Sequence, residues 1–200
     1  MARLPHAEAR QVIGLLGGSF NPPHAAHLQI SETALKRLRL DRVWWLVSPG
    51  NPLKSRAEDA PLSRRVALAR EMARDSRILV TDFEAELPTA FTASTLAFLK
   101  ARGPRARYVW LMGADNLASI HRWHRWREIF ALMPVAVIDR PGWQLKALSS
   151  PAARAFARAR VNAGQALTLP YRKAPAWVFL GGPLSELSST ALRSKGAARM

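Results

Sequence analysis

The stretch from Val12 to His27 (VIGLLGGSFNPPHAAH) constrains the fold of this chain more than any other. Its apolar start, Val12 to Leu16, predicts a buried strand, and the Gly17–Gly18 pair that follows predicts a turn. A helix is expected from near His24, because apolar residues recur beyond it at helical spacing. A helix N-terminus behind a glycine turn offers unpaired N–H groups and a positive dipole end, which suits a phosphate.

The side chains of this stretch also suit an anion. Gly17 and Gly18 have no Cβ, so a ligand can approach their backbone closely. His24 and His27 are three residues apart, which places both on one face of the first helical turn. The stretch is not a Walker A loop, because no lysine follows the glycines, and its glycine spacing does not fit the dinucleotide fingerprint. The alternative is a strand–turn–helix whose histidines are incidental.

Composition indicates a globular enzyme-sized domain. Two hundred residues with 48% hydrophobic content suit one α/β domain over residues 1–200, with a core at about 12–195. The chain has no cysteine, and so neither a disulfide framework nor a thiolate metal site is expected. It also lacks an apolar run of about 18 residues and an apolar N-terminal signal segment, so we expect no membrane association and a cytoplasmic location.

The net charge of +16 invites a nucleic-acid-binding function. However, 24 of the 30 basic residues are arginine, and alanine is abundant throughout the chain. Both amino acids have GC-rich codons, and the basic residues are dispersed along the sequence. We therefore expect no nucleic-acid partner, and a milder attraction for anionic substrates.

Alternating apolar runs and amphipathic segments predict an α/β fold. The order implies right-handed crossovers and a Rossmann-like open parallel sheet of about six strands, with helices on both faces. On the second helix, Arg64, Arg65 and Arg70 are predicted to lie off the buried face. After the first, the predicted strands are Arg42–Ser48, Ile78–Thr81, Arg107–Met112, Pro134–Ile138 and Ala176–Leu180. The predicted helices run from His24 through Leu38, over Pro61–Ala73 and Thr92–Lys100, from Asp115, over Ser149–Arg160, and over Leu187–Arg193.

Several later residues fall where strands end, which is where ligands sit in open α/β sheets. Lys54 follows the second strand and is either a phosphate ligand or a solvated loop lysine. Gly113 gives a tight exit from the fourth strand, and Asp115 is expected to cap the next helix. Trp123 and Trp126, three apart, are predicted to share a helical face, with Trp126 packed in the core and Trp123 free to stack on a flat ring. A metal site at His121 and His124 is not expected, since no carboxylate joins them.

The first stretch resembles the G-[GS]-S-F-[DN]-P-x-H-x-G-H signature of the nucleotidylyltransferase superfamily, with Ala26 where that signature has glycine. The chain's LSSTALR, from Leu187 to Arg193, resembles the I-S-S-T-x-x-R motif of the same enzymes. A serine there is able to cap a helix, and the arginine one turn later brings a planar fork for phosphate oxygens. An ordinary capped terminal helix is the alternative for this motif taken alone.

A third set of motifs resembles the nicotinate-nucleotide adenylyltransferases. NPLK is similar to their P-P-H-K loop, with Leu53 in place of histidine, and FTASTL is similar to their Y-T-x-D-T-L element, with Ser94 in place of aspartate. The stretch from Trp110 to Trp126 is similar to their G-x-D-x-L…W-x-x-W element, and DRPG matches the turn after their fifth strand. The resemblance runs from Gly14 to Arg193.

This resemblance implies transfer of AMP from ATP to nicotinate mononucleotide, giving deamido-NAD and pyrophosphate. Mg²⁺ would be carried by the ATP phosphates with no protein metal site. Open alternatives are another acceptor, such as phosphopantetheine or nicotinamide mononucleotide, and a non-catalytic basic nucleotide- or nucleic-acid-binding protein; the oligomeric state is also open. The implied catalytic residues are His24, His27 and Arg193. The implied ATP-binding residues are Gly17, Gly18, Ser19, Phe20, Lys54, Gly113, Asp115, Ser188, Ser189 and Thr190, and the implied acceptor-binding residues are Thr92 and Trp123.

Overall fold

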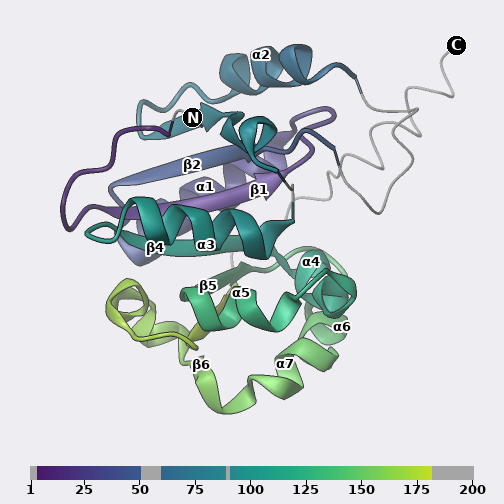
Figure 1. Cartoon of the computed structure of the whole chain (residues 1–200). Coiled ribbons are helices and arrows are strands. Elements are labelled where there is room, and N and C mark those ends of the chain that lie inside the picture. Colours follow the sequence, from purple (N-terminus) through teal and green to yellow (C-terminus); the bar gives the residue numbers. More distant parts are fainter. Residues whose placement is uncertain (1–3, 51–59, 89–90, 182–200) are drawn as a thin grey trace, which may run out of the picture.

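The computed structural model describes residues 4–50, 60–88 and 91–181. Within them it has one seven-stranded sheet with helices on both faces (Figure 1). The strands are β1 (Val12–Gly18), β2 (Arg42–Val47), β3 (Ile78–Thr81), β4 (Arg107–Gly113), β5 (Val135–Ile138), β6 (Arg160–Val161) and β7 (Trp177–Leu180). The α-helices are α1 (Ala25–Leu38), α2 (Leu62–Met72), α3 (Thr92–Arg102), α4 (Ala114–Ser119), α5 (Trp126–Leu132), α6 (Gln144–Leu148) and α7 (Pro151–Ala155). Short 3₁₀ helices are η2 (Phe83–Glu86), η3 (Ile120–Arg122), η4 (Ala157–Ala159) and η5 (Ala163–Tyr171).

Every strand pairing is parallel, in the order β3-β2-β1-β4-β5-β7-β6. The chain runs outward through β2 and β3 on one side of β1 and returns to β4 on the other. The strand order therefore reverses between β1 and β4. In open α/β sheets the crevice beyond the carboxyl ends of the strands at such a point is where ligands bind.

The two faces of the sheet carry separate hydrophobic clusters. On one face α1 and α2 pack against β1 and β2, with α1 contributing Ile30, Ala34, Leu35 and Leu38. On the other face α3 and α5 lie in front of the sheet in the view of Figure 1. Residues alternate along β1 between these clusters, as the two-residue period of a strand requires, so that Leu15 faces one and Leu16 the other. No helix of the described ranges is long and apolar enough to cross a lipid bilayer.

The predicted fold class is confirmed, and the structure adds one strand and replaces one predicted helix. All six predicted strands are present, but a seventh, β6, adds a two-residue edge strand that is too short to produce a periodic signal. The single helix predicted over Ser149–Arg160 is wrong. It is replaced by α6, α7 and η4, because the Ser150 hydroxyl accepts a hydrogen bond from the Ala153 N–H and begins a new helix there.

The predictions for α2 and for the tryptophan pair also need correction. Arg65, predicted to lie off the buried face of α2, is only 2% exposed. Trp123 does not share a helix with Trp126, because α5 begins at Trp126 and Arg125 before it has a left-handed backbone with φ of 51°. Trp126 is buried as predicted, with its ring edge-on to Phe130 and Phe156.

Candidate active site

The candidate site lies beyond the carboxyl ends of β1, β4 and β5, beside the reversal in strand order. Ser19 follows β1, α4 begins directly after Gly113 of β4, and Arg140 follows β5. Strand β1 pairs with β4, which in turn pairs with β5, so the residues after these strands meet at one edge of the sheet. The first two of these segments contain residues that were predicted as site residues from the sequence, namely Ser19, Gly113 and Asp115.

His24 and His27 form a stacked pair at the start of α1. His24 is the N-cap residue, and its backbone N–H donates a hydrogen bond to Nδ1 of His27 over 3.2 Å. The two rings stack with centroids 3.9 Å apart. Because Nδ1 of His27 accepts a hydrogen bond, the proton of the neutral ring resides on Nε2. That nitrogen lies near the glycine turn, 3.7 Å from where a Cβ on Gly18 would stand.

Both histidines are uncharged at neutral pH. Burial and, after it, the nearby cation of Arg140 lower the pKa of His24 to about 4, against the opposing effect of Asp115. Burial also lowers the pKa of His27 to about 3, with contributions from His24 and then Arg140. Two stacked imidazoles beside a guanidinium cannot both carry charge without strong repulsion. The pair therefore presents N–H donors and lone pairs, and Arg140 supplies the positive charge.

An aromatic stack fixes the position of His27. Phe20 is fully buried, has a positive φ of 49°, and lies between the ring of His27 at 4.4 Å and that of Trp45 at 5.0 Å. The indole N–H of Trp45 donates to the hydroxyl of Ser31 over 2.8 Å, and that hydroxyl donates to the carbonyl of His27 over 2.8 Å. The structure thus places Phe20, predicted as an ATP-binding residue, with its ring in the core under the site.

The two glycines have different surroundings. A Cβ on Gly17 would stand 2.5 Å from the Trp110 ring, so this glycine is required by packing against β4. A Cβ on Gly18 would make only ordinary contacts, the nearest at 3.4 Å with Phe20. Gly18, which faces His27, is therefore the glycine whose bare surface borders the candidate site. Gly17 supports the turn from beneath.

Arg140 is the cation that the sequence analysis did not single out. Its Nη1 donates to Oδ2 of Asp115 over 3.0 Å, and both side chains are largely covered. A Cβ on Gly113 would overlap Oδ1 of Asp115 and lie 2.9 Å from Cδ of Arg140, so the absence of a side chain at Gly113 is what makes room for the ion pair. The prediction that Asp115 caps α4 is wrong, because Gly113 is the N-cap residue and the Asp115 carboxylate turns to Arg140.

Arg65 connects the loops after β1 and β2. Its guanidinium donates to the carbonyls of Ser19 at 2.6 Å, Ser48 at 2.7 Å, Pro49 at 3.3 Å and, through Nε, Ala60 at 2.9 Å. A buried charge of this kind is stable only when its donors are satisfied, and here backbone carbonyls satisfy them. The path of the chain through Ser19 therefore depends on a side chain from α2.

The two predicted acceptor-binding residues lie at the start of α3 and after η3. Thr92 is its first residue, and within the described ranges no side chain caps this helix end and no acid lies in its first turn. The ring of the preceding residue, Phe91, packs on His124 with centroids 4.4 Å apart. Trp123, next to His124, is partly buried and packs against the core cluster on this face. The two predicted acceptor-binding residues thus lie on segments that touch.

A buried carboxyl group lies behind α3. Glu84 accepts a hydrogen bond from the hydroxyl of Thr95 over 2.7 Å, and both side chains are buried. Burial raises the pKa of Glu84 to about 7, and the Thr95 hydrogen bond only partly opposes this. Neither residue was predicted as a site residue: Glu84 belongs to no motif, and Thr95 belongs only to the FTASTL element.

Five predicted site residues lie outside the described residues: Lys54, Ser188, Ser189, Thr190 and Arg193. Their roles stay predictions. Over residues 4–50, 60–88 and 91–181 no three His, Asp or Glu side chains gather as metal ligands.

Comparison with known proteins identifies the family. The cytidylyltransferase-like family model matches residues 15–195. A probable nicotinate-nucleotide adenylyltransferase from Methylorubrum extorquens (strain PA1) is 60% identical over 183 residues, which is 92% of this chain and 99% of that protein. One from Rhizobium johnstonii, with the same name, is 54% identical over 191 residues, 96% of each chain.

Solved structures share the fold. The nicotinic acid mononucleotide adenylyltransferase of Plasmodium falciparum, complexed with NaAD, superposes with a TM-score of 0.69 at 16% identity, covering 92% of this chain and 83% of that one. At this identity the likeness concerns the fold alone. The sequence matches extend over nearly the whole chain. The chain therefore belongs to the cytidylyltransferase-like family and, within it, to the nicotinate-nucleotide adenylyltransferases.

Proposed function

We propose that the chain transfers AMP from ATP to nicotinate mononucleotide, giving deamido-NAD and pyrophosphate in NAD biosynthesis. The observation that carries this proposal is the 60% identity to a probable nicotinate-nucleotide adenylyltransferase over 92% of the chain. The geometry supports it, because the histidine pair and Arg140 lie at the edge of the sheet where ligands bind in open α/β folds.

In this reaction an oxygen of the acceptor's 5′-phosphate attacks the α-phosphorus of ATP. A new bond forms between that oxygen and the α-phosphorus. The bond from the α-phosphorus to the oxygen that bridges the α- and β-phosphorus atoms breaks, and pyrophosphate leaves with the electron pair. The attacking phosphate is already an anion and needs no Ser or Cys nucleophile. The task of the protein is to align the two phosphates and to stabilise charge on the leaving group.

The stacked histidines serve this task as neutral donors. Nε2–H of His27 lies beside Gly18, and His24 has a buried Nδ1 with no hydrogen-bond partner among the described residues. An unpartnered buried nitrogen is costly, and a phosphate or its hydration shell would satisfy it. Arg140 supplies the cation next to this pair, and we propose that Lys54 and Arg193 add two more.

The start of α3 suits the carboxylate of the acceptor. The N–H groups of Thr92 and its successors have no side-chain cap within the described ranges and point from the positive end of the helix dipole. A carboxylate accepts from such donors, whereas a carboxamide brings N–H groups of its own that need acceptors. The pyridine ring would then lie against Trp123.

Magnesium enters with the substrate in this proposal. Asp115, a carboxylate at this edge of the sheet, is paired with Arg140, and among the described residues no three His, Asp or Glu side chains gather as metal ligands. This donor set fits an ion held mainly by phosphate oxygens and water, as Mg²⁺ commonly is. When bound, the ion neutralises charge on the triphosphate.

Pyrophosphate release from Mg²⁺–ATP tests the proposal, with nicotinate mononucleotide, nicotinamide mononucleotide, phosphopantetheine or no acceptor. We expect pyrophosphate and deamido-NAD in equal amounts with the first acceptor. His27→Ala reports any contaminating activity, and Arg64→Gln, at an exposed position of α2, is the matched control that keeps full activity. Faster release with phosphopantetheine, or no release with any acceptor, would overturn the assignment.

A further inference from the structure

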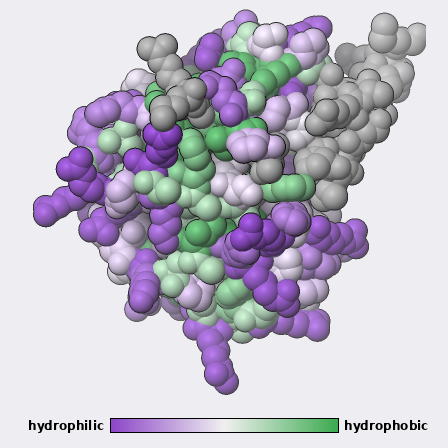
Figure 2. Space-filling view, in the orientation of Figure 1, coloured by the Kyte–Doolittle hydropathy of each residue, from purple (hydrophilic) through white to green (hydrophobic). Residues whose placement is uncertain are grey.

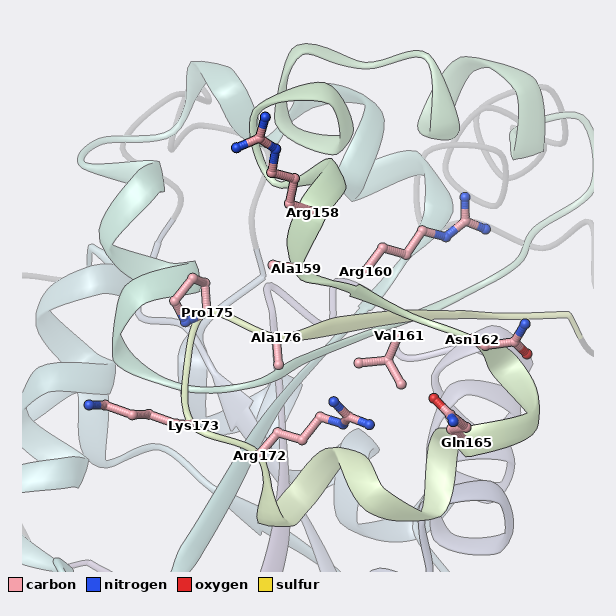
Figure 3. Close-up of a pocket in the computed structure, with 10 residues that line it drawn as sticks. All are labelled: Arg158, Ala159, Arg160, Val161, Asn162, Gln165, Arg172, Lys173, Pro175 and Ala176. Atoms are coloured by element: carbon pink, nitrogen blue, oxygen red, sulfur yellow. The ribbon is translucent and has the colours of Figure 1, made fainter.

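A second concave site lies at the far edge of the sheet, away from the carboxyl ends of β1, β4 and β5. It is a pocket of about 520 Å³ at the edge strand β6 and the amino end of β7 (Figure 3). Its size falls within the range of small-molecule sites. The lining residues all come from one stretch of chain: Arg158, Ala159, Arg160, Val161, Asn162, Gln165, Arg172, Lys173, Pro175 and Ala176.

The lining carries four cations and no acid. Arg158, Arg160, Arg172 and Lys173 are exposed, and within the described part of the chain none of them forms an ion pair. The local sequence explains why. From Arg140 to Ser185 the chain has seven Lys or Arg residues and no Asp or Glu. Figure 2 shows hydrophilic side chains projecting along the lower rim of the molecule, where Figure 1 places α7 and β6.

Two of the three guanidinium groups are held in place. Arg160 lies over the ring of Trp177, 5.4 Å from its centroid, and Nε of Arg172 donates to the hydroxyl of Thr168 over 3.0 Å. In Figure 3 the side chains of Arg172 and Gln165 rise from η5 toward Val161, while Arg160 leaves β6 on the opposite side. Arginines whose position is fixed beforehand lose less freedom on binding, which raises affinity for an anion.

The remaining lining suits more than a bare ion. Asn162 uses its side-chain oxygen to accept from the Gly164 N–H at 2.8 Å, so its amide NH₂ stays available as a donor. Gln165 adds a second amide. Val161 and Ala176 form an apolar floor between the cations. Guanidinium groups bind phosphate oxygens through their fork, and the amides and floor suit a sugar or base attached to that phosphate.

We propose that this pocket binds a small phosphorylated ligand of the nucleoside diphosphate class, at a site separate from the active site. The pocket is an open hollow formed by a single stretch of chain, and its volume of about 520 Å³ is that of a small ligand. A nucleic-acid strand would instead call for cations spread along an open groove. The site shares no residue with the histidine pair or with the start of α3.

The indole N–H of Trp177 provides a local readout. It donates to the Phe156 carbonyl over 2.8 Å, and its ring lies under Arg160. Its cross-peak in a ¹⁵N–¹H spectrum, assigned with Trp177→Phe, would be followed during titration with ADP. The test variant is Arg160→Gln/Arg172→Gln. The matched control is Arg64→Gln/Arg70→Gln, which removes the same charge from exposed positions of α2 at the other end of the sheet.

In the parent protein we expect a saturable shift of this cross-peak with ADP. The pocket variant should bind at least tenfold more weakly, the α2 variant should bind within twofold of the parent, and adenylyl transfer should be unchanged in both. If the double variant does not fold, Arg172→Gln alone is compared with Arg70→Gln. A shift that never saturates, equal binding by the two variants, or a Trp177 response to a short single-stranded RNA but not to ADP would overturn the proposal.

Discussion

Two buried titratable sites, the histidine pair and Glu84, carry less charge than the same groups would in water, for opposite reasons. The histidine pair on α1 has lost its protons, because burial and the Arg140 cation lower both pKa values. Glu84 beside α3 is half protonated near pH 7, because burial raises its pKa and no cation is close enough to oppose this. The histidine pair lies next to a positive charge, whereas the only polar partner of the Glu84 carboxyl among the described residues is the hydroxyl of Thr95.

This difference in surroundings suggests that the histidine pair binds a ligand and that Glu84 has a structural role. An arriving polyanion would favour protonation of the histidines, since a negative charge nearby raises the pKa of an imidazole. The protonation of Glu84 should respond little to such a ligand, because its pKa is set by burial. Unfolding would release both groups to ordinary pKa values. Between about pH 4.5 and 6.5 the histidines thus make stability rise with pH, and Glu84 makes it fall.

The largest effect on stability is expected from Arg65, which holds the loops after β1 and β2 next to the histidine pair. Arg65→Met removes the donors to four loop carbonyls, of Ser19, Ser48, Pro49 and Ala60. Leaving buried acceptors unsatisfied should lower the free energy of unfolding by about 4 kcal/mol. Urea denaturation measures this, with Arg64→Met on the exposed side of the same helix as the control. Equal stability of the two variants would show that the loops hold themselves.

Glu84→Gln should change stability in a pH-dependent way. The folded pKa of about 7 lies above the unfolded value of 4.5, so the parent loses stability as pH rises between these values and the non-ionising variant does not. The variant should match the parent near pH 5 and exceed it at pH 8 by on the order of 3 kcal/mol. Thermal melts across this range would check it. A pH-independent difference would mean that Glu84 has the same pKa in the folded and the unfolded protein.

His27→Ala tests the histidine pair through catalytic activity. It removes the Nε2–H donor beside Gly18 and should reduce kcat by about 10²-fold, as loss of one stabilising donor typically does. Glu32→Ala, at an exposed position of α1, is the control for the helix itself. Turnover within twofold of the parent, in a variant that melts normally, would remove His27 from the reaction.

The smallest expected effect concerns the choice of acceptor. Nicotinate mononucleotide should be preferred over the nicotinamide form by at least tenfold in kcat/KM, about 1.4 kcal/mol, because the uncapped start of α3 offers donors only. Trp123→Ala should weaken both acceptors and leave the ratio nearly intact, since both pyridine rings stack. Equal kcat/KM values in the parent would contradict the preference, and a ratio that collapses in the variant would assign discrimination to the ring position.

The sequence predicted the sheet well because central parallel strands are short apolar runs between turn residues. Each of the six predicted strands begins within one residue of its position in the structure and ends within two. The largest difference is at β1, which continues past the predicted end at Leu16 into Gly17 and Gly18. The two-residue β6 was missed, since pairing with β7 makes it a strand and no periodicity can develop over Arg160–Val161.

The candidate site was predicted less completely, and tertiary contacts explain the difference. Helical periodicity assigned Arg65 to the surface, because it cannot register a long side chain that bends back to loop carbonyls. Arg140 was interpreted only as part of the DRPG turn, so nothing in the sequence placed it in a site. The ion pair of Arg140 with Asp115 depends on the absence of a side chain at Gly113, which lies in another strand. Trp123 was placed on a helix because spacing alone does not reveal the left-handed residue at Arg125.

The contact between Gly17 and Trp110 gives the protein an intrinsic optical probe. The indole of Trp110 packs directly under the glycine turn, is 3% exposed, and its N–H has no hydrogen-bond partner among the described residues. An indole in such dry surroundings emits at short wavelength. Any ligand that settles on the turn changes the field at this ring without touching it. Substrate arrival at the phosphate edge should therefore be visible as a change in tryptophan fluorescence, with no label added to the chain.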